Sequence, residues 1–418
     1  MTETCNSRGF SRLMKSCFPN TTQPEYSQQT TYLIRNSDKL LPENHQTTLS
    51  TLPDDLLLEC LSRLPLSSLS SVSLVCRKWS LLIDSGSFYD IRRRQCVLRQ
   101  TIFAVSVADS SFRVANHRIG CESDWEIAPI RGLEIVMPEI FDQSFSFSHS
   151  RLIEIGRHVY ILSRNSTLRY DTWSGGITSR SPMIFPRKKF AAAGINGNIY
   201  VSGGAARTAT VEEYTPETDT WRIVAESARR RYGCLGAAVD RVFYVIGGLK
   251  INNRAESCSQ DARDYASTMD LYDVETRGWL RSRRVPGGGC VVAACAVGGH
   301  LYILTSHAVE LSFWRYDGRR KMSGFGEWCR MKSPPLPAQV RVDNSVRFSC
   351  VGVGEEKGKV VLIQVLGCID DLLRRSGRSC RGFKEGLVLV YDCEIGEWSR
   401  DLDLPSIIRR AACVCVEC

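Results

Sequence analysis

The sequence predicts an α+β multidomain protein in which a short all-α domain is followed by an all-β propeller. Three observations lead to this fold class. Residues 52–83 place apolar side chains at helical spacing, short apolar runs separated by turn residues follow from about residue 96, and three later passages repeat one scheme of strands. A repeat of about 45–55 residues holding four short strands suits a propeller blade, because each twisted sheet buries its faces only against its neighbours.

The composition is that of a folded protein. The 418 residues are 43% hydrophobic, 9% aromatic and 24% charged, which excludes bulk disorder. Residues 1–48 differ, since they are rich in Ser, Thr, Gln and Asn and show no sustained period. We expect a disordered polar tail there, then a helical domain over residues 49–93 and the propeller over residues 97–418.

No targeting or membrane segment is visible in the sequence. No apolar run is long enough to cross a bilayer, and residues 1–20 lack the apolar stretch of a secretory signal. We therefore expect a cytoplasmic and/or nuclear protein without membrane contact, its 18 cysteines being free thiols. The net charge of +9 is moderate and weak evidence for nucleic acid, so no such partner is expected.

Helix signals divide the segment after residue 50. Pro53 suits a first helical turn, Asp54 and Asp55 complement the positive end of the helix dipole, and Pro65 ends the helix. Ser67 can cap a second segment. In that segment apolar residues recur at helical spacing, namely Leu69, Val72, Cys76, Trp79 and Ile83.

The repeated passages share a small-residue strand, a short turn, a second apolar strand and a later strand in which a Tyr precedes a Trp. The Tyr-to-Trp spacing is seven residues in three of them, Tyr214 to Trp221, Tyr272 to Trp279 and Tyr391 to Trp398. Small residues, as in 191–194, 236–238 and 293–296, belong on the innermost strand, where blades crowd the axis.

The blade count comes from pairing both ends of the propeller region. Passages at 150–177, 182–221, 229–279, 287–328 and 346–398 give five blades, and strands near 101–127 lack an inner strand that residues 410–416 can supply. Such a closure leaves no exposed sheet edge, which favours six blades. Three blades depart from the pattern. Ile177 follows Tyr170 by seven residues with Trp173 out of phase, Tyr316 to Trp328 spans twelve, and the 346–398 blade carries a long insertion.

Two family resemblances are carried by these residues. Residues 52–83 resemble an F-box, with its Leu-Pro, Leu-Pro, Val-Cys and Trp series. Residues 180–281 resemble kelch repeats, with paired glycines at 203–204 and 247–248 before each Tyr–Trp pair. The combined architecture resembles the plant F-box/kelch-repeat proteins.

The resemblance implies a substrate-recognition subunit of an SCF-type ubiquitin ligase. Its F-box would dock a Skp1-like adaptor and, through it, a cullin, while the propeller would hold a target protein for ubiquitination and degradation. Independently, Leu57, Leu61 and Leu64 mark one apolar face and Leu56 and Cys60 a second, more than a small helical unit can bury. The motif positions expected to contact or support the adaptor are Leu52, Pro53, Leu57, Leu64, Pro65, Val75, Cys76 and Trp79. Alternatively, they merely pack a helical cap onto the propeller.

Basic residues recur just before or at the start of successive inner strands. One residue from each cluster represents the predicted target-binding set, Arg187, Arg230, Arg283, Arg347 and Arg409. If these cations converge on one face, their guanidinium groups would select an acidic or phosphorylated segment of the target. The alternative is that they bond loop carbonyls between blades or lie in solvent.

Two other functions remain open at this level. Some kelch propellers are small-molecule enzymes, and others are binding scaffolds without a ligase role. The sequence shows no metal-ligand or nucleophile pattern, since Cys413, Cys415 and Cys418 fit core packing better than a zinc set. We therefore expect a non-catalytic adaptor without cofactor or metal.

Overall fold

The structure is a computed structural model. It describes residues 52–108, 111–134, 136, 149–205, 208–250, 265–287, 289–307, 310–318, 326–336, 346–354, 358–366 and 386–418. The predicted tail over residues 1–48 lies outside these ranges. Helices and sheets alike fall in one compact unit, Pro53–Cys418. In the described residues no helix has the length and apolar character needed to cross a membrane.

The described part of the chain begins with four short helices, α2 (Asp54–Ser62), α3 (Leu66–Val72), α4 (Arg77–Ile83) and α5 (Gly86–Arg94). Pro53 and Pro65 stand at the N-caps of α2 and α3, where a missing backbone N–H costs nothing. The predicted cap at Ser67 is therefore wrong, because Pro65 begins α3 earlier. The predicted second segment is also two helices, since Cys76 is extended and serves as the N-cap of α4.

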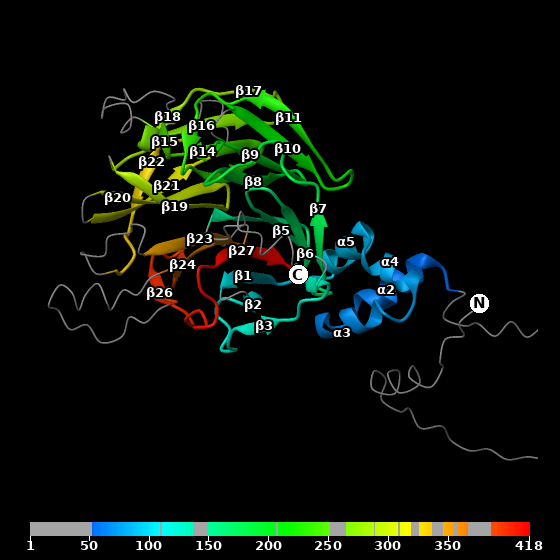
Figure 1. Ribbon diagram of the computed structural model, residues 1–418. Helices are drawn as coiled ribbons and strands as arrows, with labels where there is room; N and C mark the ends of the chain where they lie inside the picture. Colours follow the sequence, from blue (N-terminus) through cyan, green and yellow to red (C-terminus); the bar gives the residue numbers. More distant parts are fainter. Residues whose placement is uncertain are drawn as a thin grey trace, which may run out of the picture. The chain divides into compact units, whose positions relative to one another are not determined.

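In the described residues six antiparallel blade sheets follow, arranged around an axis (Figure 1); each has four strands except that of the third blade, which has a fifth. Five are consecutive in the chain from inner to outer strand. The first blade consists of β4 (Arg151–Ile155), β5 (His158–Leu162), β6 (Thr167–Asp171) and β7 (Ile177–Arg180), and the second of β8 (Ala191–Ile195), β9 (Asn198–Ser202), β10 (Thr210–Thr215) and β11 (Thr220–Glu226). The third consists of β13 (Leu235–Val239), β14 (Val242–Ile246), β16 (Thr268–Asp273) and β17 (Gly278–Trp279), with β18 (Arg283–Arg284) beside β16. The fourth consists of β19 (Cys290–Val297), β20 (His300–His307), β21 (Glu310–Asp317) and β22 (Trp328–Met331), and the fifth of β23 (Arg347–Val353), β24 (Lys359–Leu366), β25 (Val388–Asp392) and β26 (Trp398–Arg400). A two-stranded ribbon, β12 (Arg231–Tyr232) with β15 (Leu249–Lys250), adjoins the third blade.

The sixth blade is made from both ends of the propeller region, as predicted. Its order is β27 (Ala412–Glu417), β1 (Gln100–Ala108), β2 (Ser111–His117) and β3 (Glu126–Ala128). The first and last strands pair antiparallel from Gln100 opposite Glu417 to Val105 opposite Ala412. This pairing closes the ring and covers the edge of β1 that would otherwise lack a partner.

The Tyr–Trp spacing reports a cross-strand pair. In four blades the Tyr of the third strand stands opposite the Trp of the fourth, including Tyr316 opposite Trp328 despite the longer connection. Each of these Trp side chains donates its indole N–H to a backbone carbonyl at the end of the preceding blade, those of Ser181, Glu226, Arg284 and Lys332. The Trp therefore connects neighbouring blades. The twelve-residue spacing of Tyr316 and Trp328 preserves the same cross-strand pair, because only the connection between the two strands is longer.

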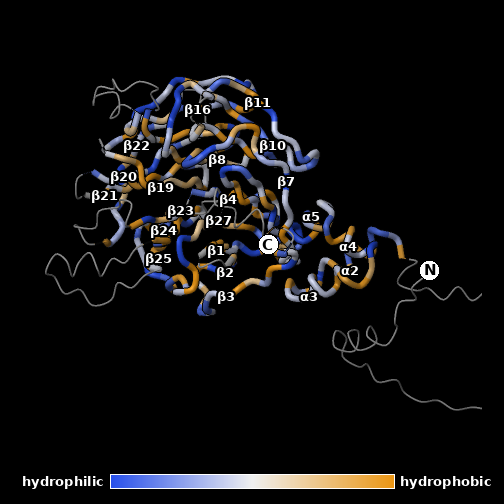
Figure 2. The backbone as a smooth tube through the Cα atoms, in the orientation of Figure 1, coloured by the Kyte–Doolittle hydropathy of each residue, from blue (hydrophilic) through white to orange (hydrophobic). Residues whose placement is uncertain are grey.

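The core lies between blades rather than in one centre. Apolar stretches occur in every blade and in the helices (Figure 2), and separate buried clusters join neighbouring blades, such as the cluster around Ile153, Phe190 and Tyr214. Small residues line the axis as predicted. A Cβ on Gly236 of β13 would stand 2.3 Å from the carbonyl oxygen of Ala192 on β8, so only glycine lets these inner strands approach.

Candidate functional site

Helix α2 has one buried and one exposed apolar face. Leu57 and Leu61 are buried, with 1% and 4% of their surface exposed, whereas Leu56 is 50% exposed and Cys60 is exposed. The two faces predicted from helical spacing are therefore present, and the helical unit buries only one of them. Water-exposed leucine on a helix adds to the surface that a partner can cover.

Two further exposed leucines were missed in the sequence. Leu74 and Leu81 are 74% and 62% exposed, and Val75 is 46% exposed. Leu81 carried a usable signal, because it is two residues from Trp79 and so turns away from the buried side of α4. Leu74 carried none, since it follows an unpredicted helix end at Val72. These four exposed side chains, Leu56, Leu74, Val75 and Leu81, are called the apolar helical face below.

The predicted adaptor set divides by exposure. Leu57 and Trp79 are buried and support the helices from inside, while Leu64 and Cys76 are half-buried and Leu52 is partly exposed. The exposed members are Pro53, Pro65 and Val75. Contact between these residues and an adaptor stays a prediction.

A charged cluster joins the helices to the first blade. The Arg157 guanidinium donates to the carbonyl of Ile83 at 2.5 Å and to the carboxylates of Asp84 and Asp171. Burial disfavours the charged form of Asp171, yet the nearby His158, with Nε2 3.6 Å from the carboxylate, and the charge of Arg157 outweigh it and hold the pKa of Asp171 well below its ordinary value. Asp84, His158 and Asp171 bring metal-type ligand atoms together, but the guanidinium already supplies the cation between the carboxylates.

Trp173 explains the out-of-phase tryptophan of the first blade. Its ring packs edge-on against Phe88 of α5, with centroids 5.5 Å apart, and the Arg157 guanidinium stands 4.4 Å from its centroid. In the blade itself Ile177 takes the place opposite Tyr170. Trp173 thus contacts the helices instead of the next blade, which the repeat pattern could not show.

The last strand also contacts the helices. Arg93 of α5 lies 3.1 Å from the carboxylate of Glu417 on β27. Burial and the charge of Glu417 raise the pKa of Tyr89 to about 12, so its neutral hydroxyl donates to Glu417 at 3.4 Å.

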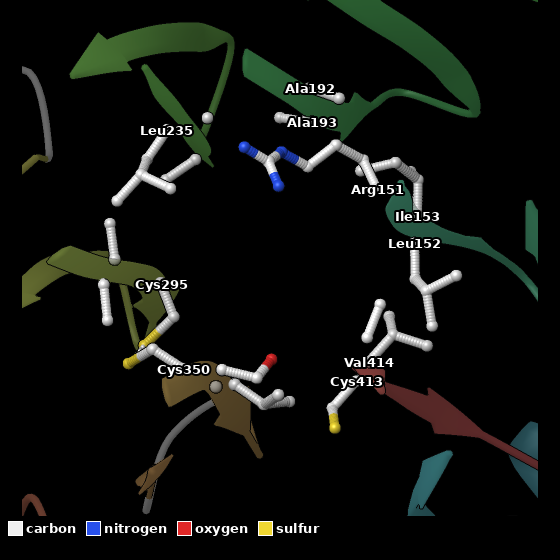
Figure 3. Close-up of a pocket in the computed structure, with 18 of the residues that line it drawn as sticks. Arg151, Leu152, Ile153, Ala192, Ala193, Leu235, Cys295, Cys350, Cys413 and Val414 are labelled. Atoms are coloured by element: carbon white, nitrogen blue, oxygen red, sulfur yellow. Dashed lines mark hydrogen bonds between the residues drawn. The ribbon is translucent and has the colours of Figure 1, made fainter. Parts of the chain in front are cut away.

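An axial channel of about 660 Å³ opens between the six inner strands (Figure 3). Small residues such as Ala192 and Ala193 line its wall, and the Arg151 guanidinium points into it. Lys189 and Arg347 line the same channel from two other blades. The thiols of Cys295 and Cys350 are 3.2 Å apart and lie across the channel from Arg151.

The predicted arginine ring is wrong as a single surface. Of the five chosen residues only Arg347 lines the channel. Arg230 and Arg409 are exposed elsewhere, and Arg283 is half-buried in β18. Arg151, the first residue of β4, was overlooked, although it has the positional signal used for the others. Lys189 belongs to the predicted basic cluster that Arg187 represents, and it is this lysine rather than Arg187 that lines the channel.

Arg187 is a structural residue, which corrects its assignment to target binding. Its side chain is fully buried and donates to Glu212 at 2.6 Å and to the carbonyl of Gly203 at 2.7 Å. Arg231 repeats this arrangement one blade later with Asp270 and the carbonyl of Gly247. The loop-carbonyl alternative is therefore right for Arg187, because a buried acidic side chain holds the guanidinium inside the blade.

Comparison with known proteins agrees with this architecture. The F-box domain model matches residues 49–91 and the kelch motif model residues 186–227. An F-box/kelch-repeat protein of Arabidopsis thaliana is 56% identical over 425 residues, covering 100% of both chains. The chain belongs to the F-box/kelch-repeat family.

More distant relatives of this F-box/kelch-repeat protein carry the same name. A second Arabidopsis thaliana F-box/kelch-repeat protein is 25% identical over 288 residues, which cover 66% of this chain and 69% of the relative. Among solved structures, that of YjhT aligns with 62% of this chain and 84% of its own, with a TM-score of 0.45 and 17% identity. F-box/kelch proteins are generally substrate receptors of SCF ligases and typically non-catalytic adaptors.

Proposed function

We propose that this F-box/kelch-repeat protein is the substrate receptor of an SCF-type ubiquitin ligase. Its helices α2–α4 dock a Skp1-like adaptor, which connects it to a cullin, and its propeller holds a protein target for ubiquitination and degradation. The observation that carries the proposal is the apolar helical face, whose four side chains are each at least 46% exposed. An adaptor that covers them removes this surface from water.

The receptor performs no bond chemistry in this scheme. It holds the target beside a ubiquitin-charged enzyme supplied by the cullin, so that transfer becomes effectively intramolecular. We place this activity in the cytoplasm and/or the nucleus.

Variants of the apolar helical face test adaptor docking. Leu74→Asp with Leu81→Asp places two charges where the adaptor should lie, and both sites are exposed, so the helices should still fold. Covering each leucine contributes about 1.5–3 kcal/mol, so the Kd for a purified Skp1-like adaptor should rise at least about 100-fold.

A matched control comes from the propeller. Leu249→Asp with Ile395→Asp changes residues that are 52% and 73% exposed but lie outside the helices, in β15 and in the connection between β25 and β26. Its adaptor Kd should equal that of the wild type. Equal binding by the helical variant, or an equal loss in the control, would contradict the proposed docking surface.

Affinity capture after proteasome blockade separates a receptor from a scaffold without a ligase role. The helical variant should lose the adaptor and the cullin but retain a protein that accumulates when the proteasome is blocked. A target whose ubiquitination and abundance do not differ between the variant and the wild type would favour the scaffold.

A further inference from the structure

One end of the axial channel gathers cations from three blades. Arg151 is the first residue of β4, Arg347 is the first residue of β23, and Lys189 stands two residues before β8. All three line the channel together with His149. Because the inner strands of a propeller run in the same direction around its axis, their first residues meet at one mouth.

The electrostatics of this mouth are uniformly positive. Burial and the neighbouring charges of Lys189, Arg347, Lys188 and Arg151 lower the pKa of His149 to about 4, which keeps its imidazole neutral at pH 7. Burial and its cationic neighbours, Arg347 first, also lower the pKa of Lys189. The described neighbours whose charges shift the pKa values of His149 and Lys189 are all cations, and none is a carboxylate.

The channel has one described carboxylate, Glu154, further along β4. Its surroundings raise its pKa to about 7, so it is only partly ionised at neutral pH. Among the described lining residues, cations therefore outnumber carboxylates at this mouth.

Two of the cations are held in fixed positions. The Arg151 guanidinium donates from Nε to the carbonyl of Phe190 at 2.8 Å and from Nη2 to that of Cys234 at 3.3 Å, and it projects into the opening (Figure 3). Within the described residues Nη1 has no protein acceptor. Lys189 adopts φ +55°, a left-handed conformation that a lysine rarely takes, and its ammonium lies 5.6 Å from the ring centroid of Tyr232. Strain of this kind collects at functional sites.

We propose that the channel mouth formed by Arg151, Lys189 and Arg347 is a phosphate-binding site, which receives a phosphorylated side chain of the target. A phosphate monoester carries a charge of about −1.5 to −2 and three acceptor oxygens, which match several converging donors better than one carboxylate does. The small residues of the inner strands leave the channel open for it. The inference rests on the proposed receptor function for the source of the phosphate.

The first test uses inorganic pyrophosphate and the full chain bound to its adaptor. Calorimetry should show binding, and Lys189→Gln with Arg347→Gln should weaken it at least about tenfold. The matched control Arg230→Gln changes an exposed arginine outside the channel and should bind as the wild type does. Binding that the channel variant leaves unchanged, or that potassium chloride of equal ionic strength reproduces, would overturn the phosphate site.

A spectroscopic measurement locates the ligand independently. With histidine labelled at Cε1, pyrophosphate should raise the pKa of His149 by at least about one unit, because a bound anion stabilises the imidazolium. His149→Gln identifies the signal. A His149 titration curve that pyrophosphate does not move would place any bound anion elsewhere and refute the site.

Peptide probes decide the source of the phosphate. We compare the binding of four ligands: a pentapeptide of Gly and Ala that contains one phosphoserine, the same peptide with Ser at that position, the same peptide with Glu there, and inorganic phosphate. Tighter binding of the phosphopeptide than of all three supports a target side chain. Equal or tighter binding of free phosphate, or of the Glu peptide, overturns that source. Adaptor capture by the channel variant should stay normal, so failure here is distinct from failure of the receptor function.

Discussion

Replacing Arg187 with Ala should destabilise the propeller without altering the channel. The substitution removes the partner of Glu212, whose side chain is 0% exposed, and leaves the carbonyl of Gly203 without its donor. Among the described residues, only the backbone N–H of Ile184, 2.7 Å from Oε2, would still donate to the Glu212 carboxylate. Arg187→Ala thus isolates the structural role that the sequence pattern mistook for recognition.

The magnitude follows from the burial of the pair. Breaking a buried ion pair by removing one partner costs about 3–5 kcal/mol, because the other charge stays buried and uncompensated. For a domain of this size that loss corresponds to a fall in Tm of roughly 5–10 °C. The neighbouring Arg230 is exposed, so Arg230→Ala should change the unfolding free energy by less than about 0.5 kcal/mol.

Thermal unfolding followed by tryptophan fluorescence measures the difference, with adaptor concentration held constant. Trp221 reports on the same blade, since its indole N–H bonds the carbonyl of Ser181. Arg187→Met combined with Glu212→Met should recover most of the lost stability, because no unpaired charge remains. A Tm within about 1 °C of the wild type for Arg187→Ala, or a double variant no better than the single one, would refute the reasoning.

Three further outcomes are expected. Trp173→Ala should lower the free energy of unfolding by about 3–5 kcal/mol and speed limited proteolysis between the helices and β1, because Phe88 loses its ring contact. An unchanged cleavage rate would contradict this. Gly236→Ala should lower Tm because a Cβ would meet the backbone of the next inner strand, whereas Gly86→Ala, with open space around it, should not. The pKa of Glu154 is about 7 in the folded protein and 4.5 ordinarily, so the wild type loses unfolding free energy as pH rises between these values. Glu154→Gln lacks this loss, and its stability relative to the wild type should therefore increase over the same pH range. A gain confined to low pH would contradict this.

The repeat made the fold predictable, because a blade with a tight turn places its Tyr and Trp at a fixed spacing in the sequence. Tyr214 and Trp221 are seven residues apart because a tight turn places them opposite each other on adjacent strands. The same register survives at Tyr316 and Trp328 through a longer connection, which spacing alone could not show. Helix ends were harder, since the break at Cys76 depends on one extended residue inside an otherwise helical period.

The candidate sites were less predictable, because side-chain burial depends on partners distant in sequence. Arg230 and Arg231 look alike in the sequence, yet the first is exposed and the second is buried against Asp270. A signal was present, since Glu212 and Asp270 both stand two residues before the blade Tyr and face the matching arginine. Where that acidic residue is replaced, as by Trp314 before Tyr316, no such ion pair can form.

The last strand connects ring closure with attachment of the helices. β27 pairs with β1, lines the channel through Cys413, and places Glu417 within reach of Arg93 and Tyr89 on α5. Because one strand takes part in all three, a change that detaches β27 would open the sixth blade, alter the channel wall and release a contact to the helices together. The strand that completes the sixth blade is thus also one that attaches the helices to the propeller.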